Sequence, residues 1–390
     1  MEVYTLDEQL RRTEVCDWFN SMIWTERYSE YGDFEMVIDD TLSTRNLFTY
    51  GTKIAINLSK RVMTVETIEA KTDDEGNEIL DITGRSIEAV MDDRLARNAV
   101  SNLTDTPKWT ITGLPADIAR EIFQTVCVDA VIDPGDAIPF YTEGSLYPAS
   151  TIPEPTDSIS YDVDVSTVYS AIKTLCDTYN LGFRLVRNQD LSELHFDVYS
   201  GNDRTTQQTA NTTVIFSTAL DNLANPSELT SIAAYKNVAY VIAPNGTAVV
   251  YADLVDPGVA GFERRALVIK ADDITTEAGA DLDASLQQRG KDELAKNRNT
   301  YAFDGEIPQF GTYKYGTDYE LGDIVEMRGK DGAANDMRVT EQIFVSDENG
   351  ERSYPTLVIN LFITPGSWDA WPTAQQWGDL DADETEWADA

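Results

Sequence analysis

The residues that could do chemistry in this chain are few: one histidine and three cysteines, beside 68 carboxylates. His195 is the only imidazole, and the alternation of Leu194–Val198 puts it on the face opposite the apolar residues. This pattern favours a half-exposed strand residue over a catalytic base. A single histidine excludes two-histidine metal sites, which removes most zinc peptidases. No GxSxG or cysteine-protease flank accompanies it.

The other chemistry-bearing residues give no specific signal. Cys16, Cys127 and Cys176 are scattered, which argues against a zinc site or a disulfide framework and fits a reducing cytoplasm. Pairs of carboxylates, as glycoside hydrolases use, arise by chance among 68 acids. Asp73–Glu78 is acidic but lacks calcium-loop spacing, so it reads as a hairpin turn, with a surface cation as the alternative. No catalytic, cofactor-binding or metal-ligating residue is assigned, no nucleotide-binding glycine loop is present, and no enzyme is predicted.

The formal net charge of −38 excludes whole classes of function. Such a chain is repelled by phosphate, so gripping nucleic acid and binding an anionic membrane are disfavoured. Solubility or a salt-rich habitat is the alternative explanation of the charge. The acidic segment Met1–Glu8 does not resemble a signal peptide, and no run of 18 apolar residues exists. We therefore expect a chain that is made in the cytoplasm, is not secreted and does not insert into a membrane.

The elements that must position these residues begin with strands. The pattern predicts β-strands over residues 1 to about 90. Phe34, Met36 and Ile38 alternate with residues of the opposite face, and Ile54, Ile56 and Leu58 do the same. Residues 64–83 predict a hairpin with a polar loop at 73–77. Residues 86–98 predict a helix with one apolar face, made by Ile87, Val90, Met91 and Leu95.

The middle of the chain changes character. Pro115 favours the start of a helix over 116–126. Residues 121–172 contain no Lys or Arg and hold a long, Pro-rich acidic loop. A helix follows over 165–179, capped by Asp164 or Ser166 and ended near Gly182, and then strands over 183–187 and 194–199. This α-β-β unit predicts a second domain.

From about residue 212 the pattern is β again. Asn245-Gly246 predicts a hairpin between 238–242 and 248–251, a helix covers about 282–298, and strands return at 324–327, 337–345 and 356–363, with a last hairpin at Asn349-Gly350. Residues 366–390 carry seven carboxylates, four of the seven tryptophans and no basic residue. Such a tail is either solvated or a docking segment that orders on assembly.

Three segments resemble a known family. They are Trp24–Tyr28 followed by Gly32–Glu35, Ile82–Ile87 running into Asp93-Arg94, and Tyr315–Val325 with the upstream helix segment Gln288–Leu294. In this order and spacing they resemble the siphophage minor tail proteins of actinobacteria-infecting phages, which are related to tailed-phage baseplate hub proteins. The resemblance covers about 365 residues and leaves out the C-terminal tail.

The resemblance implies an α+β, β-rich fold with two tail-tube-like β-barrel domains. Residues 1–95 would form the first barrel, completed by strands from 212–255; residues 96–211 the inserted α-β-β domain; residues 212–365 the second barrel and a smaller accessory domain; and residues 366–390 the tail. Three such protomers would make a homotrimer whose six barrels continue the hexameric tail tube.

The function implied is that of a structural tail-tip hub in the virion. Its partners would be other copies of itself, the distal tail protein, the tape-measure protein and downstream minor tail or receptor-binding proteins, and double-stranded DNA would pass without specific binding. Two alternatives stay open. A tail-associated cell-wall hydrolase would need more than the roughly 25 residues that follow the hub-like region. A receptor-binding adhesin could use the acidic loop of 133–158, although repeats and fibrous segments are missing.

Overall fold

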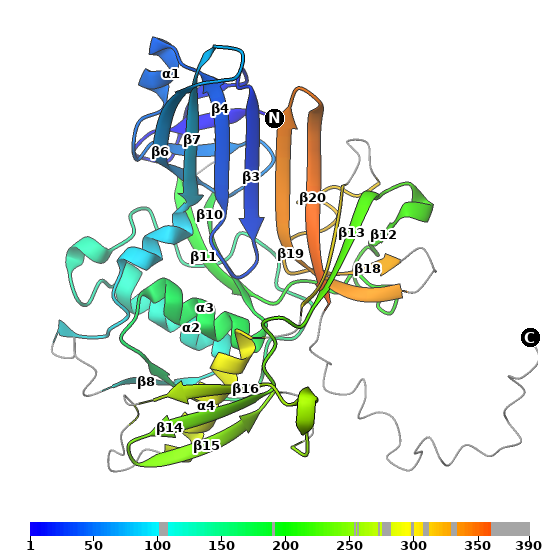
Figure 1. The fold of residues 1–390 in the computed structure, drawn as a ribbon. Helices are drawn as coiled ribbons and strands as arrows, with labels where there is room; N and C mark the ends of the chain where they lie inside the picture. Colours follow the sequence, from blue (N-terminus) through cyan, green and yellow to red (C-terminus); the bar gives the residue numbers. More distant parts are fainter. Residues whose placement is uncertain are drawn as a thin grey trace, which may run out of the picture. The chain divides into compact units, whose positions relative to one another are not determined.

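The fold is α+β and rich in strands, as Figure 1 shows. The computed structural model describes residues 1–100, 108–188, 192–252, 255, 257–271, 274, 282–297, 300–306, 312–328 and 334–359. Residues 1–359 form one unit. The predicted C-terminal tail of 366–390 lies outside the described residues. Among those described, no helix is long and apolar enough to cross a membrane.

The N-terminal region is a sheet of seven strands. They are β1 (Val3–Leu6), β2 (Arg12–Cys16), β3 (Ser21–Arg27), β4 (Asp33–Asp39), β5 (Lys53–Ile56), β6 (Met63–Thr72) and β7 (Glu78–Ser86), in the order β3-β4-β7-β6-β5-β1-β2. The alternation of β4 is confirmed, because Phe34, Met36 and Ile38 are buried. So is the hairpin of β6 and β7 around residues 73–77. Leu58 corrects the prediction: it follows β5 and is 42% exposed.

Two short helical segments flank this sheet. α1 (Leu42–Leu47) is closed at its start by a capping box of Thr41 and Thr44. Where a helix over 86–98 was predicted, the chain forms the 3₁₀ segment η1 (Ile87–Asp93). Its Glu88 is completely buried and bonded to Arg61 and to the Leu185 amide, so tertiary contacts override the helical periodicity.

The inserted region packs two helices against two hairpin-like pairs. Its elements are β8 (Trp109–Gly113), α2 (Pro115–Phe123), the π segment η3 (Gln124–Val128), the 3₁₀ turn η4 (Pro134–Asp136), β9 (Ile159–Val163), α3 (Val168–Tyr179), β10 (Gly182–Asn188) and β11 (Glu193–Tyr199). Pro115 starts α2 as predicted. The caps of α3 differ from the prediction: Thr167 caps its start, and Asn180, at φ 55°, takes the left-handed position expected near Gly182.

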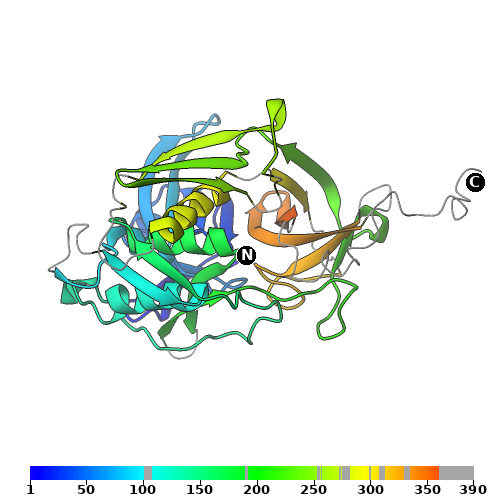
Figure 2. The ribbon, with the colours of Figure 1, turned by 90° about the horizontal axis from the view of Figure 1, so that it is seen from below.

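The C-terminal half forms a small sheet and a continuation of the large one. The strands are β12 (Ile215–Ser217), β13 (Ala224–Ser231), β14 (Val238–Ala243), β15 (Gly246–Tyr251), β16 (Ala266–Lys270), β17 (Thr300–Glu306), β18 (Ile324–Arg328), β19 (Ala334–Asp347) and β20 (Gly350–Ile359); η5 (Thr218–Leu220), η6 (Gly261–Glu263) and the helix α4 (Leu282–Ala295) lie between them. Both Asn-Gly hairpins are confirmed. α4 packs on one face of the sheet β15-β14-β16, which Figure 2 shows from below.

The long strand β19 pairs with strands from both the N-terminal and the C-terminal region. Its first part pairs with β18, and Glu341–Ser346 pair with Arg27–Met22 of β3. Its pairing with β20 shifts register between Val339 and Glu341. The result is one 13-stranded sheet that runs from β13 to β2. We expected strands of 212–255 beside the first sheet; the strand bonded to β3 is instead β19, while β12 and β13 pair with β18 and β17.

Candidate functional site

Two of the three segments that resemble the tail-protein family, the first and the third, meet around Glu26 and Tyr28 of β3. We call this region the junction: Glu26, Tyr28, Gly182, Tyr315 and Gly322. It brings together β3, the start of β10 and the loop before β18, which are far apart in sequence. The first and third motifs therefore share one structural contact.

Glu26 is a buried carboxylate that is fully hydrogen-bonded. It is 3% exposed and accepts hydrogen bonds from Trp24 Nε1 (3.0 Å), from Tyr315 Oη (2.9 Å) and from the Ser59 hydroxyl. Three donors offset the cost of removing a carboxylate from water. Glu26 thus bonds the first sheet to the loop before β18.

Tyr28 is the centre of the junction. Its hydroxyl lies 3.0 Å from the Tyr199 carbonyl oxygen and 3.1 Å from that of Asn180, and it accepts from Arg338 Nη1 (3.2 Å). A Cβ added to Gly182 would lie 2.2 Å from the Tyr28 ring, and one added to Gly322 would lie 2.5 Å from it. Gly322 also has φ of +89°, which glycine adopts without strain. The Tyr28 ring occupies this position because neither residue has a side chain.

The second segment lies on β7, which pairs with β4 and β6, and makes its own contacts there. A Cβ at Gly84 would overlap the Thr64 carbonyl oxygen at 1.8 Å. Ser86 Oγ accepts from the Gly32 amide at 2.9 Å. One turn further, Glu88 accepts from Arg61 and from the Leu185 amide (2.9 Å), which ties η1 to β10. Arg61 and Glu88 are both buried, so the pair is screened little by salt.

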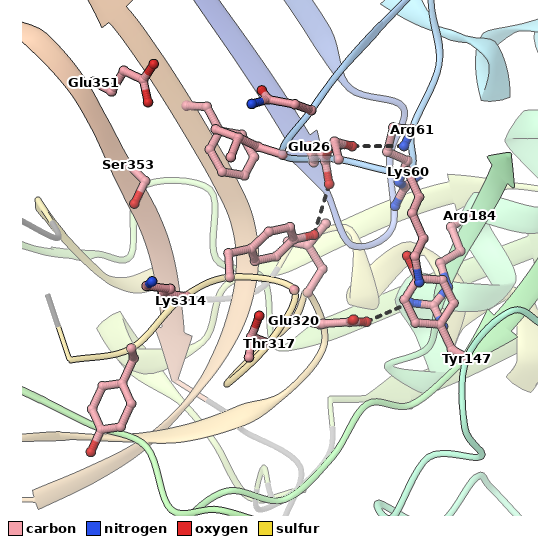
Figure 3. Close-up of a pocket in the computed structure, with 18 of the residues that line it drawn as sticks. Glu26, Lys60, Arg61, Tyr147, Arg184, Lys314, Thr317, Glu320, Glu351 and Ser353 are labelled. Atoms are coloured by element: carbon pink, nitrogen blue, oxygen red, sulfur yellow. Dashed lines mark hydrogen bonds and ion pairs between the residues drawn. The ribbon is translucent and has the colours of Figure 1, made fainter. Parts of the chain in front are cut away.

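A pocket of about 540 Å³ opens beside the junction (Figure 3). Tyr147 lies in it between two cations, with Lys60 Nζ 4.1 Å and the Arg184 guanidinium 3.3 Å from the ring centroid. Arg184 pairs with Asp197 (2.8 Å) and Glu320 (3.3 Å). Burial raises the pKa of Glu320 to about 7, against the opposing effect of Arg184. Burial likewise raises the pKa of Tyr199 to about 12.

The arrangement is suited to binding and to holding the sheets together. Glu26 is occupied by its three donors, and Glu320 and Asp197 by Arg184. The described residues offer no group of three or more His, Cys, Asp or Glu that could hold a metal ion. The pocket residues Lys60, Tyr147 and Arg184 carried no sequence signal, because they come from two loops and a strand with ordinary spacing. For the two basic residues, the low number of Lys and Arg in the chain is the one sequence feature that could have pointed to them.

His195 is buried, which corrects the prediction of a half-exposed residue. It is 6% exposed, its Nδ1 lies 3.0 Å from the Gly144 carbonyl oxygen, and its Nε2 lies 3.5 Å from Glu193. The loop around Phe140 covers this face of β11 and bonds to Leu194, through the Leu194 and Thr142 amides. Alternation alone could not foresee that a distant loop covers the second face.

The remaining candidates behave as structural residues. The cysteines are free and buried, and burial raises the pKa of the Cys127 thiol to about 12, so little thiolate forms at neutral pH. Asp73 accepts from the Glu75 and Asn77 amides in the hairpin turn. Hydrogen bonds from Asn77 lower the pKa of Asp73.

Two solved structures share this fold at low sequence identity. The tail protein from Neisseria meningitidis MC58 has 12% identity and a TM-score of 0.56, covering 92% of this chain and 96% of its own. The 43 kDa tail protein of prophage MuSo2 from Shewanella oneidensis has 13% identity and a TM-score of 0.52, covering 92% of this chain and 98% of its own. No curated protein matches the sequence.

The family comparison covers most of the chain and includes all three segments that carry the resemblance. Residues 1–357 match the family described as Siphovirus ReqiPepy6 Gp37-like protein. The resemblance drawn from the three segments is thereby confirmed. The chain belongs to this siphovirus tail protein family.

Proposed function

We propose that the protein is the tail-tip hub of a siphophage. Three copies form a ring that continues the tail tube, and each contributes two barrel-type β-domains, from residues 1–95 and 212–365. Residues 96–211 form the inserted domain, and residues 366–390 serve as a docking tail. The hub binds the tape-measure protein, the distal tail protein and the downstream minor tail or receptor-binding proteins.

The observation that carries this proposal is the continuity of the sheet through β19. β19 is hydrogen-bonded to β3 of the first region and to β18 of the second, so the two regions are parts of one sheet. Buried bonds of Glu26 and Tyr28 reinforce the connection. Two β-regions with a fixed mutual geometry suit a ring in which each protomer supplies two of six positions. Large obligate interfaces are expected for such a ring.

The charge of the chain fits a conduit that does not hold DNA. Three chains, each with a formal net charge of −38, have a total formal net charge of −114. Screening acts over about 8 Å at physiological salt, so only carboxylates close to the bore act on the phosphates. Lumen-facing carboxylates repel the phosphate backbone and keep friction low. A bore that is neutral or basic would refute this part of the proposal.

The test is an image of the assembled tail at a resolution that identifies this chain. We expect three copies at the distal end of the tube, in contact with the distal tail protein. Six copies, or a position along the tube, would contradict a hub. Mass measurement of the purified chain at several concentrations tests whether it trimerises alone.

The proposed hub has no enzymatic activity. Zymography of the purified protein on host peptidoglycan tests this directly. We expect no cleared band, whereas a cleared band that is absent from a mock purification would favour the tail-associated hydrolase.

A further inference from the structure

The pocket beside the junction has an unusual charge for this chain. Its lining contains five basic and three acidic residues, in a protein of net charge −38. The acidic ones are engaged: Glu26 by three donors, Glu320 by Arg184, and Glu351 by the N-terminal amine. Within the lining itself, basic side chains therefore outnumber acidic ones, on a protein that is acidic as a whole.

Two of the five cations are available to a ligand. Arg61 is paired with Glu88, Arg184 with Asp197 and Glu320, and Arg352 with Asp347. Lys60 and Lys314 form no ion pair with any carboxylate that the structure describes. They come from different elements, the loop after β5 and the segment before β18, and both are drawn in Figure 3. The guanidinium forks are in use, so the free donors are two separate ammonium groups.

A buried donor completes the site. Tyr199 lines the pocket and is 5% exposed, and its hydroxyl has no hydrogen-bond partner among the described residues. Burying a hydroxyl without a partner costs free energy, so a group that accepts from it would be favoured. Tyr147, Tyr315 and Phe344 supply aromatic surface in the same wall.

We propose that this pocket binds an acidic peptide segment of a partner protein, whose carboxylates pair with Lys60 and Lys314 and accept from Tyr199, and whose apolar side chains pack on the tyrosines. A volume of about 540 Å³ lies within the roughly 300–1,000 Å³ of ligand pockets. Single ammonium groups suit single carboxylates, whereas the bidentate forks that favour phosphate are occupied. The inference does not depend on the position of the protein in the tail.

The first experiment is calorimetric titration with a capped tetrapeptide of alternating glutamate and phenylalanine, and with its glutamine counterpart. We expect binding of the acidic peptide alone, and affinity about tenfold lower for the double variant Lys60→Gln, Lys314→Gln. Lys270→Gln, an exposed lysine on β16, is the matched control and should not change the affinity. Equal binding of both peptides, or tighter binding of inorganic phosphate or a single-stranded oligonucleotide, would overturn the proposal.

Tyr199→Phe separates binding from folding. Removing a hydroxyl that lacks a partner should leave the denaturation midpoint of the free protein unchanged or raised. The same variant should bind the acidic peptide about tenfold more weakly. A lower midpoint with unchanged affinity would mean that the hydroxyl has a structural role only, and would overturn this part of the site.

Proton uptake gives a third readout. Glu320 faces Arg184 of β10, Lys60 of the β5–β6 loop, Asp323 of its own turn, and the hydroxyls of the pocket tyrosines, Tyr147, Tyr199 and Tyr315. A ligand carboxylate disfavours the Glu320 anion, so binding should take up protons and strengthen as pH falls from 8 to 6, around its pKa of about 7. Glu320→Gln should remove this dependence. A dependence that persists in Glu320→Gln would assign the proton to another group and contradict the geometry.

Discussion

The junction differs from the accessory unit, residues 238–295 with β14, β15, β16 and α4, in the side chains that make up its core and its surface. The junction and the side chains bonded to it bury charged groups: Glu26 is 3% exposed, and Arg338, which donates to Tyr28, is 4% exposed. The accessory unit buries apolar side chains against α4 and leaves others on the outer face of its sheet. Val268, Ile242 and Val249 are 63%, 45% and 44% exposed there.

This difference indicates which region contributes most of the long-range contacts of the fold. Junction contacts link segments more than a hundred residues apart, such as Tyr28 with Tyr199 and Glu26 with Tyr315. The accessory unit contacts the inserted region through polar bonds of α4, including Thr178 to Asp292 (3.0 Å) and Arg289 to Asp164 (2.6 Å). We expect the junction to be sensitive to single substitutions and the outer face of the accessory sheet to tolerate them.

The largest effect is expected where a buried charge loses its partner. Glu88→Gln leaves Arg61 without its counter-ion inside the protein, which costs about 3–5 kcal/mol. Urea denaturation should show this loss in the free energy of unfolding. Glu66→Gln is the control, because its pair with Arg85 is partly exposed and should contribute less than about 1 kcal/mol. Equal effects of the two variants would contradict the role given to the buried pair that ties η1 to β10.

The second effect tests the close approach of Tyr28. Gly182→Ala places a methyl group 2.2 Å from the ring and 2.8 Å from the Tyr28 carbonyl oxygen, so strand and ring must separate. We expect a loss of about 3 kcal/mol in the free energy of unfolding. Gly113→Ala meets its nearest atom at 3.8 Å and should cost less than about 1 kcal/mol. A tolerated Gly182→Ala would mean that the Tyr28 contact is loose.

The third effect belongs to the accessory unit and depends on pH. Burial raises the pKa of Asp292 from 3.8 to about 6, against hydrogen bonds from Gln288 and Thr178. A raised folded-state pKa means that its contribution to stability is fully present below pH 3.8 and is lost as pH rises through 6. The free energy of unfolding of Asp292→Asn, relative to that of the wild type, should therefore rise by about 2 kcal/mol as the pH is raised from 4 to 8.

The measurement is a pair of denaturation series across that pH range. Asp283→Asn, which removes an exposed carboxylate from the same helix, should leave the difference from the wild type constant. A difference for Asp292→Asn that does not change with pH would show that this carboxylate is not buried as a charge.

The smallest effect is expected on the outer face of the accessory sheet. Val268→Thr should change the free energy of unfolding by less than about 0.5 kcal/mol, because the side chain is already 63% exposed. Val241→Thr on the neighbouring strand faces α4, is fully buried and should cost about 1–2 kcal/mol. A large cost for Val268→Thr would mean that this face is covered in the folded protein.

Local patterns predicted local structure well. Turn chemistry predicted the hairpins at Asn245-Gly246 and Asn349-Gly350, and proline at the first helical position predicted α2. The predictions failed where a distant segment decides. The helix over 86–98 gave way to η1 because Glu88 is held by Arg61, and His195 was buried by the loop around Phe140.

The candidate site was even less accessible to sequence reasoning. The motifs containing Glu26 and Glu320 were identified, but nothing in their spacing predicts that they meet. Lys60 and Tyr147 come from loops without any motif, and their contact depends on how the inserted region packs. A periodic pattern reports which face of an element is buried, whereas a pocket is made by elements that meet only in the folded chain.

The pairing of β3 with β19 also sets the order in which the protein can fold during synthesis. About 300 residues separate the two strands, so β3 is made long before its partner. At roughly 5–20 residues per second, the ribosome needs on the order of 15–60 s to supply β19. During that interval the edge of β3 is open to pairing with another chain. The nascent chain is thus open to aggregation during this period, because β4 pairs with the other edge of β3 and leaves this edge uncovered.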